Sequence, residues 1–251
     1  MCGISGILGP RPERDWHAWA SLTRHRGPDA LGVWVTDDAV LCHNRLSIID
    51  LSAAANQPMV SADGRYHIVF NGEFFNYQEL GEELRNLGHS FRTKSDSEVL
   101  LTGFIEWGDA VLDRLDGMFG FAIWDQHAKK LFAARDHAGI KPFFYANYRG
   151  SFVFGSEIKL LLGSGVVPPD LRHDGIFEYL AYSYVPAPGT AYEHIHCLEP
   201  GDFLWFDLES DKTETQRWWS LPALQQPRQI SETEAAEELI RLFSISVRRR
   251  M

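Results

Sequence analysis

The chain has 251 residues, 45% of them hydrophobic and 23% charged, so it can bury a large core within one globular domain. A formal net charge of −10 leaves no basic field for a phosphate backbone, which excludes a general nucleic-acid binder. Three widely spaced cysteines, Cys2, Cys42 and Cys197, imply no disulfide framework. No apolar run reaches the length of a membrane span and no signal peptide is evident, so we expect a cytoplasmic protein with reduced thiols.

Short β-like runs separated by turn residues dominate the sequence. The apolar run ISGIL (4–8) predicts a core strand directly after Cys2. Further strands are predicted at Gly32–Val35, Val40–Ile49, Tyr66–Phe70, Met118–Trp124, Lys130–Ala134, Phe143–Tyr148, Phe152–Phe154 and Asp202–Phe206.

Three helices are marked by the spacing of a capping box, in which a polar N-cap residue precedes a glutamate by three positions. These signals fall at Asn76/Glu79, Ser95/Glu98 and Ser231/Glu234. Gly88 and Gly108 are predicted to end the first two helices. Many strands with few long helices indicate an α+β fold in which helices pack on stacked sheets.

The first candidate for chemistry is Cys2, in the opening stretch MCGISGI. Once the initiator methionine is removed, the Cys2 thiol has beside it an α-amine that titrates at about pH 8. This amine can accept the thiol proton and later return it to a leaving amine, so Cys2 is a candidate nucleophile with its own base. Free cysteines are more often packing residues, and that interpretation stays open at this point.

The stretch FNGEFFNY (70–77) places Asn71 and Gly72 directly after a β-like run. Asn-Gly normally signals a hairpin turn, but a capped helix follows here instead of a return strand. We therefore expect Asn71 and Gly72 at a strand-to-helix junction. An amide side chain and a backbone N–H are the donors that an oxyanion hole requires.

Two charged residues suit the two ends of a free amino acid. Arg45, in HNRLSIIDLS (43–52), can hold a carboxylate at two points, and Asp96, at the start of a predicted helix, can bind an ammonium group. A surface arginine and a helix-capping aspartate are the structural alternatives. Together with Cys2 and the oxyanion donors, these residues predict cleavage at the side-chain carbonyl of a free amino acid.

Several blocks of the sequence closely resemble, in the same order, the N-terminal half of glutamine-dependent asparagine synthetases. The blocks are MCGISGI, RHRGPD, RLSIIDLS, QPM, FNGEFFNY, SDSEVLL, LDGMFGFAIWD, LFAARDHAGIKPFFY and FGSEIKLLL. The resemblance runs from Cys2 to Arg250. It implies a class II glutamine amidotransferase domain with the N-terminal-nucleophile hydrolase fold, an α+β four-layer sandwich of two antiparallel sheets between helical layers.

The resemblance also implies roles for individual residues. The catalytic residues would be Cys2 as nucleophile and Asn71 and Gly72 as oxyanion donors. The substrate-binding residues would be Arg45, Ile48 and Ile49 at the α-carboxylate of glutamine, and Glu73 and Asp96 near its α-ammonium. The implied function is hydrolysis of glutamine to glutamate and ammonia, which supplies ATP-dependent synthesis of asparagine from aspartate. RHRGPD would form a loop close to the nucleophile.

Several positions depart from the usual pattern of the family, including Ala30 after RHRGPD and Phe143 where leucine is common. His137 stands where an arginine is usual, and HIHCLEPGDFL (194–204) replaces a more common sequence, which puts the coupling of ammonia to its acceptor in doubt more than the hydrolysis. His194, His196 and Cys197 raise the alternative of a metal site. No fourth ligand is evident nearby, so no metal is expected.

The chain contains no SGGxDS-type nucleotide loop, so the resemblance implies that ATP and Mg belong to a synthetase domain missing from it, and no cofactor is expected in this chain. We predict an amidotransferase domain at 2–225, and a linker with the first helix of the synthetase domain at 226–251. Expected partners are glutamine and a synthetase domain or chain. A homodimer is left open, and neither nucleic acid nor membrane is expected.

Two alternatives to this function remain at this stage. One is a stand-alone or truncated amidotransferase that serves another acceptor, because acceptor chemistry lies outside the glutaminase residues. The other is a non-catalytic interaction module that has kept the fold.

Overall fold

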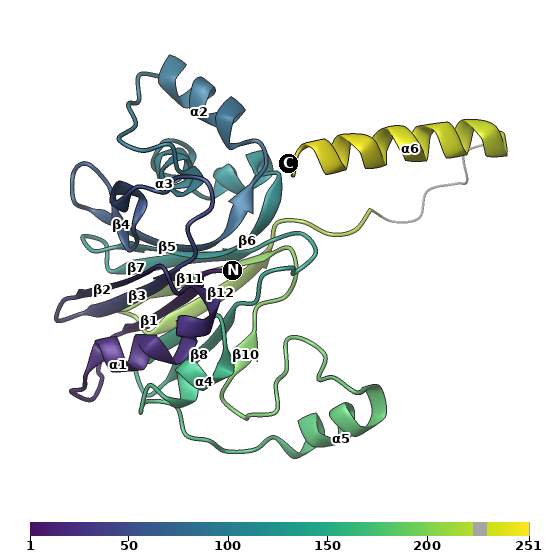
Figure 1. Ribbon diagram of the computed structural model, residues 1–251. Helices are drawn as coiled ribbons and strands as arrows, with labels where there is room; N and C mark the ends of the chain where they lie inside the picture. Colours follow the sequence, from purple (N-terminus) through teal and green to yellow (C-terminus); the bar gives the residue numbers. More distant parts are fainter. Residues whose placement is uncertain (223–229, 251) are drawn as a thin grey trace.

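The computed structural model describes residues 1–222 and 230–250. Two six-stranded antiparallel sheets lie face to face and carry helices on their outer faces (Figure 1), which confirms the predicted four-layer α+β sandwich. The strand order is β10-β8-β9-β1-β3-β2 in the first sheet and β12-β11-β7-β6-β5-β4 in the second.

The elements have the following bounds. The first sheet comprises β1 (Gly3–Leu8), β2 (Ala30–Val35), β3 (Ala39–Arg45), β8 (Phe144–Tyr148), β9 (Ser151–Gly155) and β10 (His196–Cys197). The second sheet comprises β4 (Met59–Val60), β5 (Tyr66–Phe74), β6 (Gly117–Asp125), β7 (Lys130–Arg135), β11 (Asp202–Asp207) and β12 (Lys212–Arg217). The α-helices are α1 (Trp16–Ala20), α2 (Tyr77–Asn86), α3 (Asp96–Trp107), α4 (Ile158–Leu162), α5 (His173–Tyr182) and α6 (Glu232–Arg248). Short 3-10 helices occur at Ser21–Arg26, Ala53–Ala55 and Gly108–Arg114.

Alternation along the strands sorts side chains between the layers, because successive residues of a strand face opposite sides of its sheet. Ile4 of β1, Leu41 of β3 and Val69 of β5 belong to the core between the two sheets. Phe70 and Phe74, on the other face of β5, pack in a second cluster with α2 and α3. The same strands therefore aim a defined set of side chains into the gap between the sheets.

The strand predicted at Val40–Ile49 is too long, because β3 ends at Arg45. The Arg45 guanidinium donates hydrogen bonds to the carbonyls of Ser52 and Asp50, so the chain after β3 folds around this side chain as a loop. A local sequence pattern could not reveal a contact that forms only when the loop closes.

The predicted strand-to-helix junction at Asn71 and Gly72 is also wrong. Both residues lie inside β5, which continues to Phe74 and pairs with β6 at these positions. The pairing with a long neighbouring strand overrides the turn preference of Asn-Gly.

One of the three predicted capping boxes is formed, that of Ser231 and Glu234 at α6. Ser95 caps α3 alone, because the Glu98 carboxylate binds backbone N–H groups of the preceding turn. Asn76 makes no cap, because its amide donates instead to the carbonyl of Arg114, at the end of the third 3-10 helix, and accepts from the N–H of Asp116. Tertiary partners replace the local ones in both cases.

The ends of the first two predicted helices are confirmed, since Gly88 and Gly108 have φ values of 100° and 62°. The short helices α1, α4 and α5 and the strands β4, β10 and β12 were not predicted. They are short or exposed, and such elements show little periodicity.

α6 projects from the sandwich (Figure 1), and none of its residues is buried. Residues 226–229 and 251 of the segment predicted as a linker and first synthetase helix (226–251) lie outside the described residues, and the domain boundary stays a prediction. Within the described ranges, no helix combines the length and apolar character needed to cross a membrane.

We expect two glycines to respond to alanine in opposite directions. A Cβ at Gly32 in β2 would lie 1.8 Å from the carbonyl oxygen of Gln57, so Gly32→Ala should lower the free energy of unfolding by about 1–3 kcal/mol. At Gly81 in α2 the nearest atom would be 3.6 Å away, so Gly81→Ala should raise it by about 0.5–1 kcal/mol through helix propensity. Urea unfolding of both variants measures the difference, and changes of the same sign would contradict the packing described.

Candidate active site

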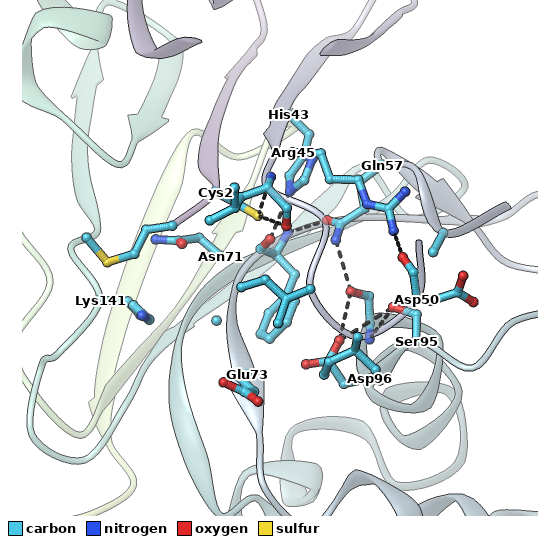
Figure 2. Close-up of a pocket in the computed structure, with 18 of the residues that line it drawn as sticks. Cys2, His43, Arg45, Asp50, Gln57, Asn71, Glu73, Ser95, Asp96 and Lys141 are labelled. Carbon is cyan, nitrogen blue, oxygen red and sulfur yellow. Dashed lines mark hydrogen bonds between the residues drawn. The ribbon is translucent and has the colours of Figure 1, made fainter. Parts of the chain in front are cut away.

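The candidate site lies at one end of the gap between the sheets, where three strands carry polar side chains beyond their core residues (Figure 2). Because alternate residues share a face, these polar residues point into the same gap as the core. On each of these strands, the residues beyond the core residue point toward the cavity. Cys2 lies beyond Ile4, next to the start of β1. His43 and Arg45 follow Leu41 on β3, and Asn71 and Glu73 follow Val69 on β5. Their side chains line a cavity of about 190 Å³.

The structure brings all eight residues singled out from the sequence to this one cavity. They are Cys2, Arg45, Ile48, Ile49, Asn71, Gly72, Glu73 and Asp96. The cavity is smaller than the roughly 300–1,000 Å³ typical of sites for drug-sized ligands, so its size suits a single amino acid.

Cys2 presents its thiol to the cavity just before β1 begins. Its Sγ accepts a hydrogen bond from the N–H of Leu46 at 3.4 Å, and its carbonyl accepts one from Nε of Arg26 at 2.9 Å. Arg26 belongs to RHRGPD, so this segment lies near the nucleophile as expected, but residues 24–26 end a 3-10 helix and only the rest of the segment is a loop. Burial raises the pKa of the Cys2 thiol, and the Leu46 N–H opposes that shift. The thiol is therefore protonated at neutral pH and needs a base before it can attack.

Asn71 places a buried amide on the cavity wall with nothing bonded to it. Its side chain is 1% exposed, and neither Nδ2 nor Oδ1 has a hydrogen-bond partner within the described residues. Leaving a buried polar group unpaired costs about 1–3 kcal/mol. Such a group is explained by a ligand that supplies the missing partner.

The N–H of Gly72 points away from β6, the strand that pairs with β5 at this position. Opposite Gly72 on β6 lies Phe119, whose N–H donates to Asp136 Oδ2 at 3.0 Å and whose carbonyl accepts from the N–H of Asp136 at 2.9 Å. In an antiparallel sheet, the N–H and carbonyl of a residue point to the same side. Gly72 and Phe119 are therefore a non-hydrogen-bonded pair, and the Gly72 N–H faces the open edge of β5.

The neighbouring groups on this open edge are bonded to side chains. The N–H of Phe70 donates to Oε1 of Gln57 at 2.6 Å, and the N–H of Phe74 donates to Oδ2 of Asp96 at 3.3 Å. The N–H of Gly72 lies between them and takes no acceptor from the described part of the chain. Gly72 N–H and the Asn71 amide thus form two adjacent unpaired donors on the cavity that holds the Cys2 thiol.

Asp96 is a buried carboxylate, only 5% exposed, at the first residue of α3. It accepts hydrogen bonds from the N–H of Phe74 and, at 3.4 Å each, from the hydroxyls of Ser95 and Ser97. Burial raises the pKa of Asp96 to about 7, and the charge of Glu73 acts in the same direction. A cation in the cavity would stabilise the ionised form of this carboxyl group.

Arg45 is a buried positive charge of the site, 7% exposed. Its Nη1 donates to the Ser52 carbonyl and to Oδ1 of Asn56, both at 2.7 Å, and its Nη2 donates to a further loop carbonyl. A guanidinium carries five N–H groups, so Nε–H and one Nη2–H remain for a ligand. The loop held by Arg45 carries Ile48 and Ile49 to the cavity.

Three further cavity residues, His43, Gln57 and Lys141, escaped the sequence reasoning. His43 is fully buried and Gln57 is 6% exposed, and each bonds to the backbone of β5. Lys141 is 6% exposed, and burial lowers its pKa. Gln57 and Lys141 lie within blocks that carried the resemblance, and His43 lies two residues before such a block, so the resemblance was the only signal in the sequence that could have marked them.

The departures from the family pattern lie outside the cavity. The ring of His137 packs edge-on against Trp218 and Trp219, and His194 lies beside Asp170 with Nε2 3.5 Å from Oδ2. In the part of the chain that the structure describes, no three His, Cys, Asp or Glu side chains converge to hold a metal ion.

Three relatives are similar in sequence to this protein over most of its chain. Asparagine synthetase [glutamine-hydrolyzing] 3 of Bacillus subtilis is 35% identical over 229 residues, covering 88% of this chain and 37% of that protein. A putative asparagine synthetase [glutamine-hydrolyzing] of Mycobacterium tuberculosis is 41% identical over 226 residues, covering 81% and 34%. The protein named amidase chry2 of Gibberella zeae is 33% identical over 245 residues, covering 88% and 34%. The chain thus spans about a third of the length of these relatives.

Comparisons of the fold and of the family agree. Glutamine phosphoribosylpyrophosphate amidotransferase from B. subtilis, solved with ADP and GMP, is 19% identical and matches with a TM-score of 0.63 over 87% of this chain and 49% of that chain, which supports the fold alone. The family model described as the glutamine amidotransferase domain matches residues 1–219. The chain belongs to the family of class II glutamine amidotransferase domains.

Proposed function

We propose that this chain hydrolyses glutamine to glutamate and ammonia with Cys2 as nucleophile. The ammonia serves ATP-dependent synthesis of asparagine from aspartate, in a synthetase domain or chain outside these 251 residues. ATP and Mg act there and not at the cavity described above. The observation that carries the proposal is the unpaired Asn71 amide beside the Gly72 N–H, which faces the open edge of β5, on the same cavity as the Cys2 thiol.

The proposed reaction has two stages. Sγ of Cys2 attacks the side-chain carboxamide carbon of glutamine, and the carbonyl oxygen becomes an oxyanion that Asn71 and Gly72 bind. The α-amine of Cys2, free once Met1 is removed, takes the thiol proton and passes it to the departing ammonia as the C–N bond breaks. Water then hydrolyses the γ-glutamyl thioester, which releases glutamate and restores the thiol.

Glutamine is selected by the two charged ends that distinguish it from a simple amide. The unused N–H groups of Arg45 bind the α-carboxylate, with backbone groups of Ile48 and Ile49 beside it. Asp96 and Glu73 bind the α-ammonium, which also compensates the buried charge of Asp96. Asp96 and Arg45 line the cavity together with Cys2, so both ends can be held while the carboxamide reaches the thiol.

A second candidate function is the supply of ammonia to another acceptor. One relative supports this alternative, because it is similar over the same stretch of sequence but is named an amidase and not an asparagine synthetase. Incubation with ¹⁵N-amide glutamine and the natural synthetase partner distinguishes the two, since the label enters asparagine in one case and a different product in the other. A non-catalytic module is disfavoured by the unpaired buried donors, which destabilise the fold unless a ligand uses them.

Replacing Cys2 tests the nucleophile. Cys2→Ala should abolish ammonia release from glutamine, measured with a coupled glutamate dehydrogenase assay, and leave Tm unchanged, because the thiol makes few contacts. Undiminished ammonia release would exclude the mechanism.

The role of the α-amine can be tested without changing any side chain. Protein cleaved from a fusion so that it starts at Cys2 should be active, whereas protein with one extra glycine before Cys2 should lose at least about 100-fold in kcat, because the base is then an amide. Equal activity of the two forms would show that the proton goes elsewhere.

Asn71 should illustrate a conflict between stability and activity. Asn71→Leu replaces an unpaired buried amide with an apolar group of similar shape, so the free energy of unfolding should stay equal or rise by about 1 kcal/mol. Loss of one oxyanion donor should lower kcat by about 100–1,000-fold with little change in KM. A variant that keeps its kcat, or one that is strongly destabilised, would contradict the assignment of Asn71 as an unpaired donor.

Asp96 should make the ligand-free protein less stable as pH rises. Its pKa is about 7 when folded and about 3.9 when unfolded, so between these values the folded state binds more protons and stability falls with increasing pH. Asp96→Asn should remove this fall, raise Tm at pH 8 by about 2–8 °C and weaken glutamine binding. Calorimetric titration of the Cys2→Ala variant, which should bind glutamine without hydrolysing it, should show proton release at pH 7, and proton uptake would contradict a carboxylate–ammonium contact.

A further inference from the structure

We propose that His43 and Gln57 are positioning residues that hold Phe70 of β5 in place of a neighbouring strand, and thereby fix the oxyanion donors on the next two residues. The proposal rests on the glutaminase function proposed above. It goes beyond that function because it assigns a task to two buried side chains that do not touch the reacting atoms.

The need for such a device follows from where β4 stops. β4 pairs with β5 only at Met59 opposite Ile68 and Val60 opposite His67. Beyond Ile68, the edge of β5 faces no strand in the described part of the chain. Buried backbone groups on such an edge need other partners.

At Phe70 the partners are two side chains that arrive from different directions. Oε1 of Gln57 accepts from the N–H of Phe70 at 2.6 Å, and Nε2 of His43 lies 3.0 Å from the Phe70 carbonyl oxygen. His43 belongs to β3 in the opposite sheet, so its bond crosses the gap between the sheets. The Phe70 carbonyl belongs to the peptide group between Phe70 and Asn71. This hydrogen bond therefore fixes the orientation of that peptide plane, next to the oxyanion donors.

The protonation state of His43 is set by its surroundings. A carbonyl oxygen can only accept, so Nε2 must carry the hydrogen, and burial lowers the pKa of His43 to about 4, which keeps the ring neutral. Nδ1 is then unprotonated, and it is buried without a partner among the described residues. An unpaired buried nitrogen destabilises the fold, so stability alone does not explain a histidine here.

Gln57 is itself held at its other end. Its Nε2 donates to Oγ of Ser97 at 2.9 Å, and Oγ of Ser97 donates to Oδ1 of Asp96 at 3.4 Å. A continuous chain of hydrogen bonds therefore runs from the N–H of Phe70 to the carboxylate proposed to bind the substrate ammonium. The two ends of the site are placed relative to one another through Gln57.

The energetic consequence follows from the geometry of oxyanion binding. Donors must lie within about 2.7–3.1 Å of the developing charge, and a displacement of about 1 Å can lower the rate by about 100-fold. If Phe70 loses its fixed position, the Asn71 amide and the Gly72 N–H move with it, although neither has been changed.

The first test separates positioning from substrate binding. His43→Leu and Gln57→Leu should each lower kcat by about 10–100-fold with KM within about 3-fold of wild type. His43→Gln keeps an N–H donor at similar reach and should recover most of the lost kcat. The rate of Cys2 alkylation by iodoacetamide, which needs no oxyanion hole, should stay the same in all three variants.

A matched control loses an equivalent buried hydrogen bond elsewhere. Thr190 is 3% exposed and lies away from the cavity. Like Gln57 it both donates and accepts: its Oγ1 donates to the Ile195 carbonyl at 2.8 Å, lies 3.2 Å from the Tyr192 carbonyl, and accepts from the Tyr192 N–H at 3.0 Å. Thr190→Val should lower Tm about as much as Gln57→Leu and leave kcat unchanged. A fall in kcat for Thr190→Val as large as that for Gln57→Leu would show that general destabilisation explains both, and would overturn the proposal.

The closing experiment combines a double-mutant cycle with amide exchange. If Gln57 acts through the oxyanion donors, Gln57→Leu should cost no more than about 3-fold in kcat when Asn71→Ala is already present, whereas full additivity would overturn the proposal. Amide hydrogen exchange at Asn71 and Gly72 should accelerate in His43→Leu and Gln57→Leu, and unchanged exchange would also overturn it. Because exchange needs no activity, it tests positioning even if wild-type protein releases no ammonia, a result that would refute only the proposed function.

Discussion

The structure depends on the apolar contact between the inner faces of the two sheets. Residues such as Phe152, Phe154 and Phe206 are fully buried in that gap, and each side chain of this size contributes about 1.5–3 kcal/mol when it leaves water. This core fixes β1, β3 and β5 relative to one another. Because the core stops short of one end, the residues that continue the same strands are left to form the cavity.

The cavity is lined by buried polar groups that lower the stability of the ligand-free fold. Asn71 holds an unpaired buried amide, His43 an unpaired buried nitrogen, and Asp96 a carboxylate whose pKa burial raises to about 7. Each of these features destabilises the ligand-free fold. Their concentration around one thiol is consistent with the proposed function, in which bound glutamine, with charges at both ends, would compensate much of this loss.

The sequence alone revealed the α+β class and most of the strands, because alternation and turn residues are local signals. It also singled out Cys2, Arg45, Asn71 and Asp96, since each residue type has a chemical capacity that is independent of its neighbours. Their convergence on one cavity is visible only in the structure. The position of Asn71 and Gly72 inside a strand depends on pairing with β6, and His43 and Gln57 depend on contacts between distant segments, so no local pattern reports them.

The close contact between Gly32 and Gln57 has a consequence for how this protein tolerates change. Gly32 does not line the cavity, yet its backbone lies against the carbonyl of Gln57, the residue whose side chain holds Phe70. Any side chain at position 32 pushes on the main chain that carries Gln57. A saturation mutagenesis screen for activity would therefore rank Gly32 with the cavity residues, and the apparent outline of the active site would extend one strand further than the cavity itself.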